Sequence, residues 1–366
     1  MLHLAHETDT AVVFQLEVDR KGSGSWSALR EVRVPAQGAV ALLFGAKERG
    51  EWVRIRARSD CRKATAYFQY AAADSRMPAP PRTSEKSEGA LLWARGEWKG
   101  TLLAAAEDTL YELDAGLNLV RIEGAKMLAW MKENLAAPTG VVGADAASIT
   151  YTDEAGRRWR LPRGNPAAGA PAPGVRISRE VSTERDLFHA GGTFYELPAN
   201  NAGGIAMVRP ICTHNLPVHD YCSWRGLTVM SGLAEPALPA GEFVRSDDGK
   251  IRLWLGVSDD LWAFGKPAGE GGPWKETPVR AGEASEPYLM TGFDSKTLRL
   301  SHANGKPLRV RVEVDITGTG VWVEYKSFDV PAGKAVEHVF PPGFHAYWLR
   351  TAAAEDATAS ATLFYR

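Results

Sequence analysis

This sequence has no long apolar run, few cysteines and almost no net charge. No stretch of its 366 residues approaches the roughly 18 consecutive apolar residues that a membrane-spanning helix needs. The 43 basic and 44 acidic side chains nearly cancel, and no long basic run is present that would follow a phosphate backbone. The sequence therefore predicts no membrane span and argues against nucleic acid as a partner.

The three cysteines are an odd number, so at least one is unpaired within the chain, and they do not identify a compartment. The N-terminus, MLHLAHETDTAVVF, lacks the basic start, apolar core and small-residue cleavage site of a secretory leader. As written, the chain is predicted to be soluble and without a signal peptide. If residues are missing upstream, a secreted or periplasmic location is the expectation.

Residues 2–70 and 298–366 are two copies of one module, related by a constant offset of 296 residues. Twenty of the 69 aligned pairs are identical, among them Trp26 with Trp322 and Trp52 with Trp348. Runs such as VVFQLEVD and LRVRVEVD alternate apolar and polar residues, the period of strands with one buried face. Turn residues divide the runs at short intervals, so each copy is predicted to be a small antiparallel β-sandwich. We expect the recurring tryptophans to pack in the core rather than to bind sugar.

The region between the copies reads as a series of β-hairpins. Examples are LLAAAEDTLYELDAGLNLVRI, SITYTDEAGRRWRLP, DLFHAGGTFYELP, YCSWRGLTVMSG and FVRSDDGKIRLWLG. Their irregular spacing fits about four or five β-propeller blades with insertions better than a solenoid. The apolar residues of AKMLAWMKENLA, 125–136, recur on one helical face, so a helix packed on the blades is predicted there.

The predicted fold is therefore all-β, with a propeller flanked by two homologous antiparallel sandwich modules. We place the first module at 1–75, a Pro- and Ser-rich linker at 76–88, the blades at 89–290 and the second module at 291–366. A propeller must hide its edges, so an incomplete set of blades predicts upstream blades or an oligomeric partner to close it. The second copy is also preceded by PYLMTGFDSKT, which has no counterpart before the first. That asymmetry predicts further chain upstream of residue 1.

The segment RPICTHNLPVHDYCSWRG, 209–226, is the densest in chemically active side chains. Histidine titrates near neutrality, so His214 or His219 is a candidate general base, with Tyr221 as the partner acid. An arginine holds a carboxylate with two hydrogen bonds, which suits Arg225 to a uronate substrate. The candidate substrate-binding residues are Arg209, Asn215, Asp220, Trp224 and Glu196. Together these side chains supply what β-elimination of an acidic sugar needs.

Other interpretations of the same segment stay open. Strict alternation along HDYCSWRG puts Asp220, Cys222 and Trp224 on one face, so half of these residues can be structural. A divalent metal is a second alternative, with Cys212, His214, His219 and Cys222 as ligands, although their spacing matches no standard zinc motif. A disulfide between Cys212 and Cys222 is a third.

The stretches RPICTHNLPVHDYCSWRGLTVMSG and DDLWAFGKPAGEGGPWKETPV resemble a group of bacterial β-propeller proteins that carry sandwich modules. More remotely, the chain is similar to the propeller enzymes that cleave rhamnose-glucuronate linkages, the rhamnose-glucuronate lyases and related α-L-rhamnosidases. That resemblance implies a catalytic histidine facing the channel, with arginine and tyrosine holding the uronate. By residue type these are His214, His219, Tyr221 and Arg225.

The leading hypothesis is a polysaccharide lyase acting on uronate- or rhamnose-containing glycans without a cofactor. A glycoside hydrolase using carboxylates such as Glu196 and Asp260 is one alternative. A non-catalytic scaffold that binds glycan or protein is the other.

Overall fold

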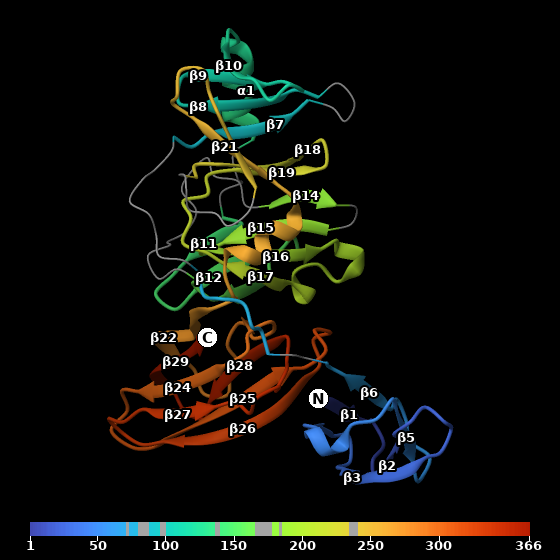
Figure 1. The fold of residues 1–366 in the computed structure, drawn as a ribbon. Helices are drawn as coiled ribbons and strands as arrows, with labels where there is room; N and C mark the ends of the chain where they lie inside the picture. The colour runs from blue at the N-terminus through green and yellow to red at the C-terminus, as the bar shows by residue number, and fades with distance from the viewer. Residues whose placement is uncertain are drawn as a thin grey trace.

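The computed structural model describes residues 1–70, 73–79, 88–95, 100–135, 140–164, 178–182, 185–233 and 241–366. Within this part of the chain, 29 β-strands accompany one α-helix and four short 3-10 helices (Figure 1), which confirms the all-β class. No helix among the described residues is long and apolar enough to cross a bilayer.

The first copy of the repeat consists of two three-stranded antiparallel sheets. One contains β4 (Ala39–Leu42), β1 (Leu2–Ala5) and β6 (Thr65–Phe68), and the other β3 (Ser27–Val34), β2 (Val12–Asp19) and β5 (Trp52–Ala57). A single 3-10 turn, η1 (Ala46–Glu48), precedes β5. Alternate residues of facing strands, such as Leu2, Leu4, Phe14 and Leu16, form a shared apolar core between the sheets.

The second copy repeats this topology strand for strand. Its strands are β24 (Lys296–His302), β25 (Leu308–Asp315), β26 (Trp322–Val330), β27 (Val336–Val339), β28 (Trp348–Ala353) and β29 (Ala357–Tyr365). The β2–β3 and β25–β26 ladders share the same register and the same bulge, before Glu17 and before Glu313. A longer strand, β22 (Gly269–Val279), extends one sheet of this copy to the order β22-β29-β24-β27.

The ungapped repeat alignment is wrong by one residue at the last strand. Leu2 lies opposite Phe68, whereas its counterpart Leu298 lies opposite Leu363. The constant offset would have paired Leu2 with Tyr67. The turn before β6 therefore holds one extra residue, and Phe68 and Tyr70 correspond to Leu363 and Tyr365.

The recurring tryptophans have two different roles. Trp26 and Trp322 each lie beneath a guanidinium group, with Arg54 4.2 Å and Arg350 4.4 Å from the ring centres. Trp348 is fully buried, as predicted for a core residue, but its counterpart Trp52 is 65% exposed. The core prediction is therefore confirmed for Trp348 and wrong for Trp52.

The region between the copies forms three four-stranded sheets of its own and adds strands to one sheet of the second copy; we number these four sheets in chain order. In the first the order is β10 (Leu119–Ile122), β9 (Thr109–Leu113), β8 (Leu102–Ala106) and β7 (Leu91–Ala94). The next contains β11 (Val142–Ala144), β12 (Ile149–Thr152) and β13 (Arg158–Leu161), which join β23 (Tyr288–Leu289), β28, β25 and β26 in one seven-stranded sheet. The third contains β14 (Ser178–Ser182), β15 (Arg185–Ala190), β16 (Thr193–Pro198) and β17 (Arg209–Thr213). The last has the order β18 (Tyr221–Trp224), β19 (Leu227–Ser231), β21 (Arg252–Gly256) and β20 (Glu242–Arg245). Three 3-10 helices complete the region: η2 (Asn200–Ala202), η3 (Gly204–Met207) and η4 (Ser258–Phe264).

These sheets stack face to face in an order that differs from the chain order (Figure 1). The β7–β10 sheet shares an apolar cluster with the β18–β21 sheet, which shares a second cluster with the β14–β17 sheet. The β14–β17 sheet packs in turn against β12, β13 and the second copy. In space the sheets thus follow the order first, fourth, third and second.

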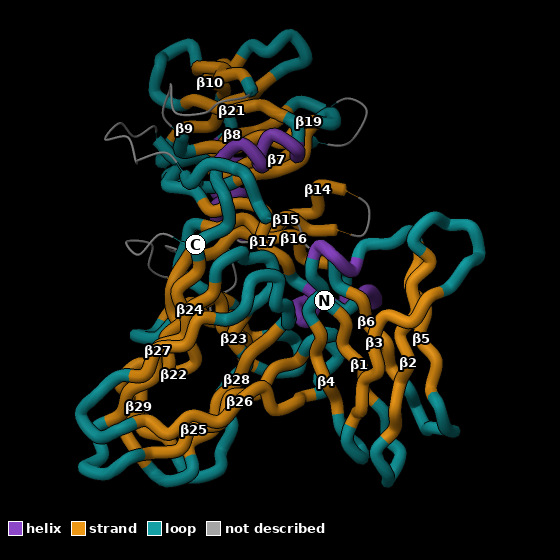
Figure 2. The backbone as a smooth tube through the Cα atoms, turned by 60° about the horizontal axis from the view of Figure 1, so that its bottom comes forward, coloured by secondary structure: helices purple, strands orange, loops and turns teal. Residues whose placement is uncertain are grey.

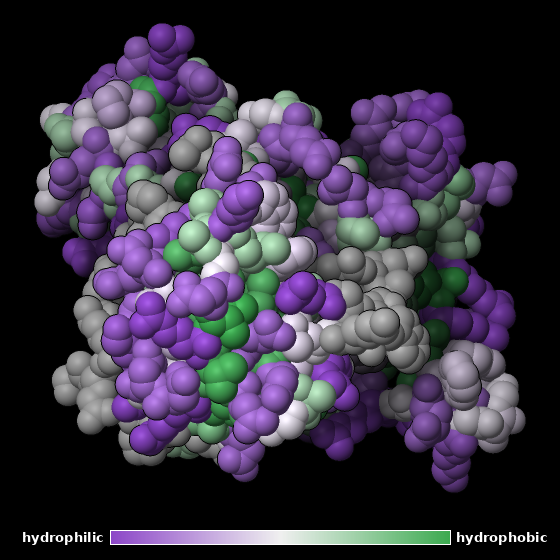
Figure 3. All heavy atoms as spheres, turned by 90° about the horizontal axis from the view of Figure 1, so that it is seen from above, coloured by the Kyte–Doolittle hydropathy of each residue, from purple (hydrophilic) through white to green (hydrophobic). Residues whose placement is uncertain are grey.

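The predicted helix is present as α1 (Ala125–Asn134). Met131 is fully buried, and Met127, Leu128 and Leu135 pack with it against the outer face of the β7–β10 sheet. The helix therefore covers the end of the stack, as its apolar face predicted. Figure 3 looks down on this end of the molecule, where hydrophilic residues surround a limited hydrophobic area.

The end of the predicted first module and the start of the predicted linker are both bonded to the body of the protein. The Asp74 amide donates to the Asp294 carboxylate at 2.8 Å, and the Arg76 guanidinium donates to the Ile211 carbonyl at 2.7 Å. Residues 80–87 of that linker lie outside the described residues.

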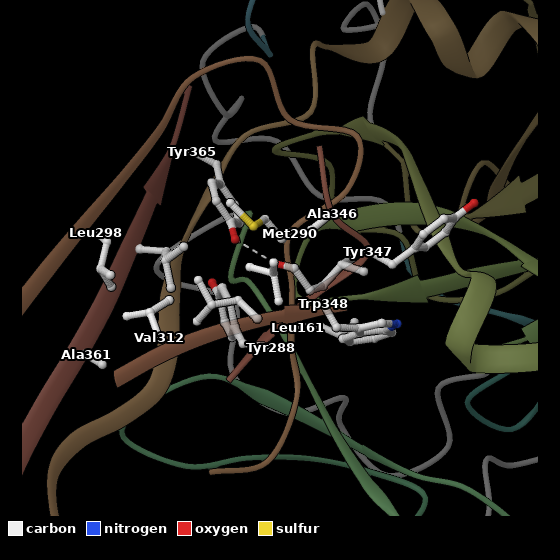
Figure 4. Close-up of a cluster of buried hydrophobic side chains, with 14 of the residues drawn as sticks. Leu161, Tyr288, Met290, Leu298, Val312, Ala346, Tyr347, Trp348, Ala361 and Tyr365 are labelled. Atoms are coloured by element: carbon white, nitrogen blue, oxygen red, sulfur yellow. Dashed lines mark hydrogen bonds between the residues drawn. The ribbon is translucent and has the colours of Figure 1, made fainter. Parts of the chain in front are cut away.

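The largest apolar cluster joins the second copy to the sheet stack (Figure 4). Its members include Leu161 of β13, Trp348 of β28, and Tyr288 and Met290. The last two belong to residues 282–293, which precede β24 and which we call the lead-in segment. Tyr365, at the end of β29, donates its hydroxyl to the Leu289 carbonyl at 2.6 Å. The lead-in segment thus lies between the second copy and the stack and holds them together.

Candidate functional site

The histidine-rich segment lies between two sheets of the stack. His214 follows β17 and is fully buried; its Nδ1 accepts a hydrogen bond from the Leu216 amide at 3.2 Å. Its ring stacks on that of His189, with 5.0 Å between ring centres. Among the described residues, Nε2 of neither imidazole has a hydrogen-bond partner. Burial lowers the pKa of His189 to about 4 and holds that of His214 well below 6.5.

The predicted acid and its neighbour also connect sheets. Tyr221 is fully buried and donates its hydroxyl to the Leu187 carbonyl at 2.9 Å, across the interface between the third and fourth sheets. The buried Asp220 carboxylate accepts the amides of Leu92, at 2.6 Å, and Tyr221, at 2.9 Å. These bonds anchor β7 to the strand that carries Tyr221.

The remaining predicted catalytic residues point elsewhere. His219 is half-buried beside the backbone of Gly89, and burial lowers its pKa. Arg225 is exposed at the tip of the β18–β19 hairpin, with a left-handed φ of 52°. The structure therefore does not gather His214, Tyr221 and Arg225 in one solvent-facing pocket.

The predicted substrate-binding residues are similarly dispersed. Trp224 is buried and donates its indole N–H to the Gly100 carbonyl at 2.7 Å. Arg209 donates to the hydroxyl of Tyr347 in the second copy, at 3.0 Å from Nε. Glu196 lies opposite Arg209 in the β16–β17 ladder, and Asn215 is half-buried in the loop after β17.

The alternation predicted along β18 is confirmed. Cys222 and Trp224 join the cluster shared with the β7–β10 sheet, whereas Tyr221 joins the cluster on the opposite face, with Cys212. All three cysteines are free thiols, so the proposed disulfide is not formed. Burial raises the pKa of the Cys212 thiol to about 12. In the part of the chain that the structure describes, no three His, Cys, Asp or Glu side chains are grouped as metal ligands.

The two carboxylates proposed for a hydrolase lie on different elements. Asp260 accepts the Val257 amide at 2.8 Å and so caps the start of η4. Glu196 belongs to a different element, the β16 strand.

A polar groove of about 490 Å³ lies instead on the outer face of the β22-β29-β24-β27 sheet in the second copy. We call it the β24–β29 groove. Its side chains include Glu270, Lys275, Glu276, Arg299, Ser301, His302, Lys334, Ser360, Thr362 and Phe364. They alternate along the strands with core residues such as Leu300 and Leu363, which is why one face of the sheet is polar.

The centre of the groove is a ladder of polar pairs. Arg299 lies opposite Thr362 and Ser301 opposite Ser360, while the half-buried Phe364 lies at the next outward position of β29. Arg299 is 4.0 Å from Glu337, and both side chains are more than half exposed. This guanidinium is therefore available to a ligand.

One wall of the groove is shaped by bulges in β22. Glu276 has a left-handed φ of 49°, which is uncommon for a residue with a side chain, and its amide is held by the Ser360 hydroxyl at 2.8 Å. His302, in contrast, has a structural role. Its Nε2 is 2.9 Å from the Val330 carbonyl, and its Nδ1 accepts the Asn304 amide. His6 makes the corresponding contacts in the first copy.

The sequence did not single out any of these groove residues as a site. One sequence difference between the copies could have pointed to them. At equivalent positions of the repeat, Arg299 and Ser301 of the second copy replace His3 and Ala5 of the first. Without the sheet order, however, nothing distinguished an open face from a covered one.

Comparisons with known proteins give little further information. No protein-family model matches the chain, and no curated protein sequence matches it significantly. A solved exo-β-1,3-galactanase from Phanerochaete chrysosporium aligns at 11% identity over 88% of this chain and 76% of its own, with a TM-score of 0.16. A glycoside hydrolase family 43 arabinoxylan arabinofuranohydrolase from Bacillus subtilis aligns at 9% identity over 75% and 77%, with a TM-score of 0.17. The V. cholerae biofilm matrix protein Bap1 aligns at 12% identity over 98% and 67%, with a TM-score of 0.12.

Scores this low carry no argument about fold or activity. None of these three proteins is a rhamnose-glucuronate lyase or rhamnosidase, so the resemblance to that family gains no support from them.

Proposed function

We propose that this protein binds oligosaccharides without cleaving them, and that the β24–β29 groove is its binding site. The observation that carries the proposal is the composition of the groove. Arg299, Glu270 and Glu276 offer charged donors and acceptors, Ser360 and Thr362 offer hydroxyls, and Phe364 offers an apolar surface. Sugar rings are recognised by this combination of hydrogen bonds to hydroxyls and contact with an aromatic ring.

The charges of the groove favour an acidic sugar over a neutral one. Lys275, Arg299 and Lys334 line it together with two glutamates, so the groove has an excess of basic groups. An arginine without a short ion pair can bind a carboxylate with two hydrogen bonds. We therefore expect uronate-containing oligosaccharides to bind more tightly than neutral ones of equal length.

Two observations disfavour catalysis. The imidazole of His214 is buried and accepts the Leu216 amide, and the buried hydroxyl of Tyr221 donates to the Leu187 carbonyl of the neighbouring sheet, so neither meets a substrate from solvent. In glycoside hydrolases the acid is a carboxyl group shielded from water, whereas Glu270 and Glu276 are both exposed. A binding role needs neither a shielded acid nor an accessible base.

In this proposal the repeated units are sandwich modules and the intervening sheets are propeller-like blades that act as a scaffold. The face-to-face packing of the sheets, three of which are four-stranded and antiparallel, supports that interpretation.

The test is calorimetric titration of the full chain with matched neutral and uronate-containing oligosaccharides. Arg299→Ala is expected to weaken binding of the acidic ligand roughly tenfold, because it removes a charge-assisted contact. Arg309→Ala is the matched control, since Arg309 is an exposed arginine on β25 in the other sheet of the same copy.

A parallel assay of reducing ends and of unsaturated product follows any cleavage. The proposal is abandoned if either product accumulates, or if Arg299→Ala and Arg309→Ala bind every ligand as tightly as the parent protein. His219→Ala is expected to leave affinity unchanged.

A further inference from the structure

The first copy exposes, at one edge, aromatic residues that the second copy buries. In the second copy, Trp348 and Tyr365 are both fully buried. Their counterparts in the first copy, Trp52 and Tyr70, are 65% and 83% exposed. A single exposed aromatic side chain is ordinary, but two at one edge, both with buried counterparts, mark a surface that a partner can cover.

The lead-in segment accounts for the burial of Tyr365 and shares that of Trp348 with the stack, since the Trp348 ring lies 4.6 Å from the ring of Trp159 and its indole N–H donates to the Ala206 carbonyl. Residues 282–293 run along the free edge of β28, where Gly282 donates its amide to the Ala353 carbonyl at 2.7 Å and Ser285 donates to Thr351 at 2.8 Å. Farther on, Met290 donates to Tyr347 at 2.8 Å. The second copy thus receives an extended strand on its sheet edge.

Side chains complete this contact. Leu289 lies opposite Trp348 in the β23–β28 ladder, and its carbonyl accepts the Tyr365 hydroxyl. The ring of Phe293 stacks on that of Tyr365, with 4.2 Å between centres and 14° between planes. Tyr365 is therefore an aromatic contact of the segment, and Trp348 lies on the same face of the sheet as its ladder partner Leu289.

The same edge of the first copy is open. β5 is the last strand of its sheet, and no strand within the described residues pairs with its outer side. Figures 1 and 2 place β5 on the side of the first copy that faces away from the second. Beside it lies a cavity of about 550 Å³ whose lining combines the apolar side chains of Phe44, Val53, Phe68 and Tyr70 with charged ones, among them Arg20, Glu48, Arg49 and Glu51. All four counterparts of these apolar residues, Phe340, Leu349, Leu363 and Tyr365, are buried in the cluster that contains Leu289 and Met290.

We propose that the β5 edge of the first copy binds an extended strand of another protein, with the side-chain pattern of Tyr288–Phe293. The incoming backbone pairs with β5, an aliphatic side chain enters the cavity beside Val53, and an aromatic ring stacks on Tyr70. Strand addition to a sheet edge is a common mode of peptide recognition, with side-chain pockets giving specificity. This inference is independent of the glycan proposal.

Charge on the strand restricts the partner further. Arg54 and Arg56 lie on β5 and share one carboxylate, that of Glu17 on β2, at 2.7 and 3.3 Å, which leaves an excess of positive charge. The Arg56 side chain is 62% exposed. Pairing with β5 of a second copy would bring like charges together, a feature that protects edges from self-association. A foreign strand with a carboxylate opposite Arg56 fits instead. The corresponding pair in the second copy is Ala284 with Ala352.

The experiment uses a fluorescein-labelled peptide of residues 282–293, GEASEPYLMTGF, titrated with the full chain and followed by fluorescence anisotropy. The second copy already holds its own tethered segment at high effective concentration, so the free peptide reports on the first copy. Trp52→Ala and Tyr70→Ala are each expected to weaken binding roughly tenfold or more. Both side chains are mostly exposed, so these variants keep the fold.

Trp130→Ala is the matched control, because Trp130 is also partly exposed but belongs to α1 at the opposite end of the molecule. It is expected to bind as the parent does. A peptide carrying Ala284→Glu is expected to bind several-fold more tightly, and Arg56→Ala should remove that gain.

The proposal is overturned if the peptide does not bind, or if Trp52→Ala binds it as tightly as the parent. It is also overturned if sedimentation shows a dimer of the parent that Trp52→Ala dissociates, because a second copy would then occupy the edge.

Discussion

The two copies of the repeat share one fold but leave opposite surfaces open. In the second copy the β28 edge is covered by residues 282–293, while the outer face of β24 and β29 forms an open groove. In the first copy the β5 edge is open, whereas the corresponding outer face is closed. Its His3 is 5% exposed, and Tyr67 packs against the cluster of the second copy.

This reversal shows that the module has two surfaces suited to contact, an edge and a face. Each copy uses one of them for the architecture of this chain and leaves the other accessible. The face residues differ accordingly. By the observed register, Tyr67 of the first copy corresponds to Thr362 of the second, and His3 to Arg299. The large aromatic side chain of Tyr67 suits a contact between the copies, whereas the small hydroxyl side chain of Thr362 suits a groove exposed to solvent.

The strongest test of the edge comparison concerns the two tryptophans. Trp348→Ala is expected to lower the free energy of unfolding by about 3–5 kcal/mol, because it leaves a cavity and removes the indole bond to the Ala206 carbonyl. Trp52→Ala should change it by no more than about 0.5 kcal/mol. Denaturant unfolding followed by circular dichroism measures both, and equal losses would show that the two edges are used alike.

The sheet stack differs from the two copies in burying a pair of stacked histidines, His189 and His214, which should make stability depend on pH. The pKa of His189 is lowered to about 4 in the folded state, from 6.5 when unfolded, so protonation favours unfolding. Its contribution to stability is complete above pH 6.5 and is lost as the pH falls toward 4, by roughly 3 kcal/mol.

His189→Phe should therefore flatten the fall in unfolding midpoint between pH 6.5 and 4, relative to the parent protein. An unchanged pH profile for this variant would mean that the imidazole is not neutral and buried in solution.

A smaller effect is expected when Tyr67 and Thr362, which occupy equivalent positions on the outer faces of the two copies, are exchanged. Tyr67→Thr should lower stability by about 1–2 kcal/mol, since it removes apolar contact between the copies. Thr362→Tyr should leave stability nearly unchanged but weaken oligosaccharide binding several-fold by filling the groove. Unfolding midpoints and calorimetric titration give the two values. Unaltered affinity in Thr362→Tyr would place the ligand elsewhere.

Local sequence patterns predicted much of the architecture. The alternation of apolar and polar residues predicted the paired strands and the two faces of β18. The apolar residues on one helical face of 125–136 predicted α1. Identities such as Glu17 with Glu313 marked the repeat, and each of these glutamates bonds the arginine at the same position of its copy. These features depend on neighbours in sequence or on directly paired strands.

Long-range packing was not predictable in the same way. The wealth of polar groups in 209–226 indicated a site, yet His214 and Tyr221 are enclosed because the third and fourth sheets stack on each other. Nothing local encodes that stacking order. The open groove was missed for the same reason, since the exposure of Arg299 depends on what covers its sheet.

The most direct test of the account is hydrogen–deuterium exchange of the full chain with and without a bound uronate oligosaccharide. We predict slower exchange on binding in β24 and β29, with no change in β1, β6 or the 209–226 segment. Protection confined to residues 209–226 would contradict the account, because it would show that ligand reaches the histidine-rich segment and leaves the groove empty.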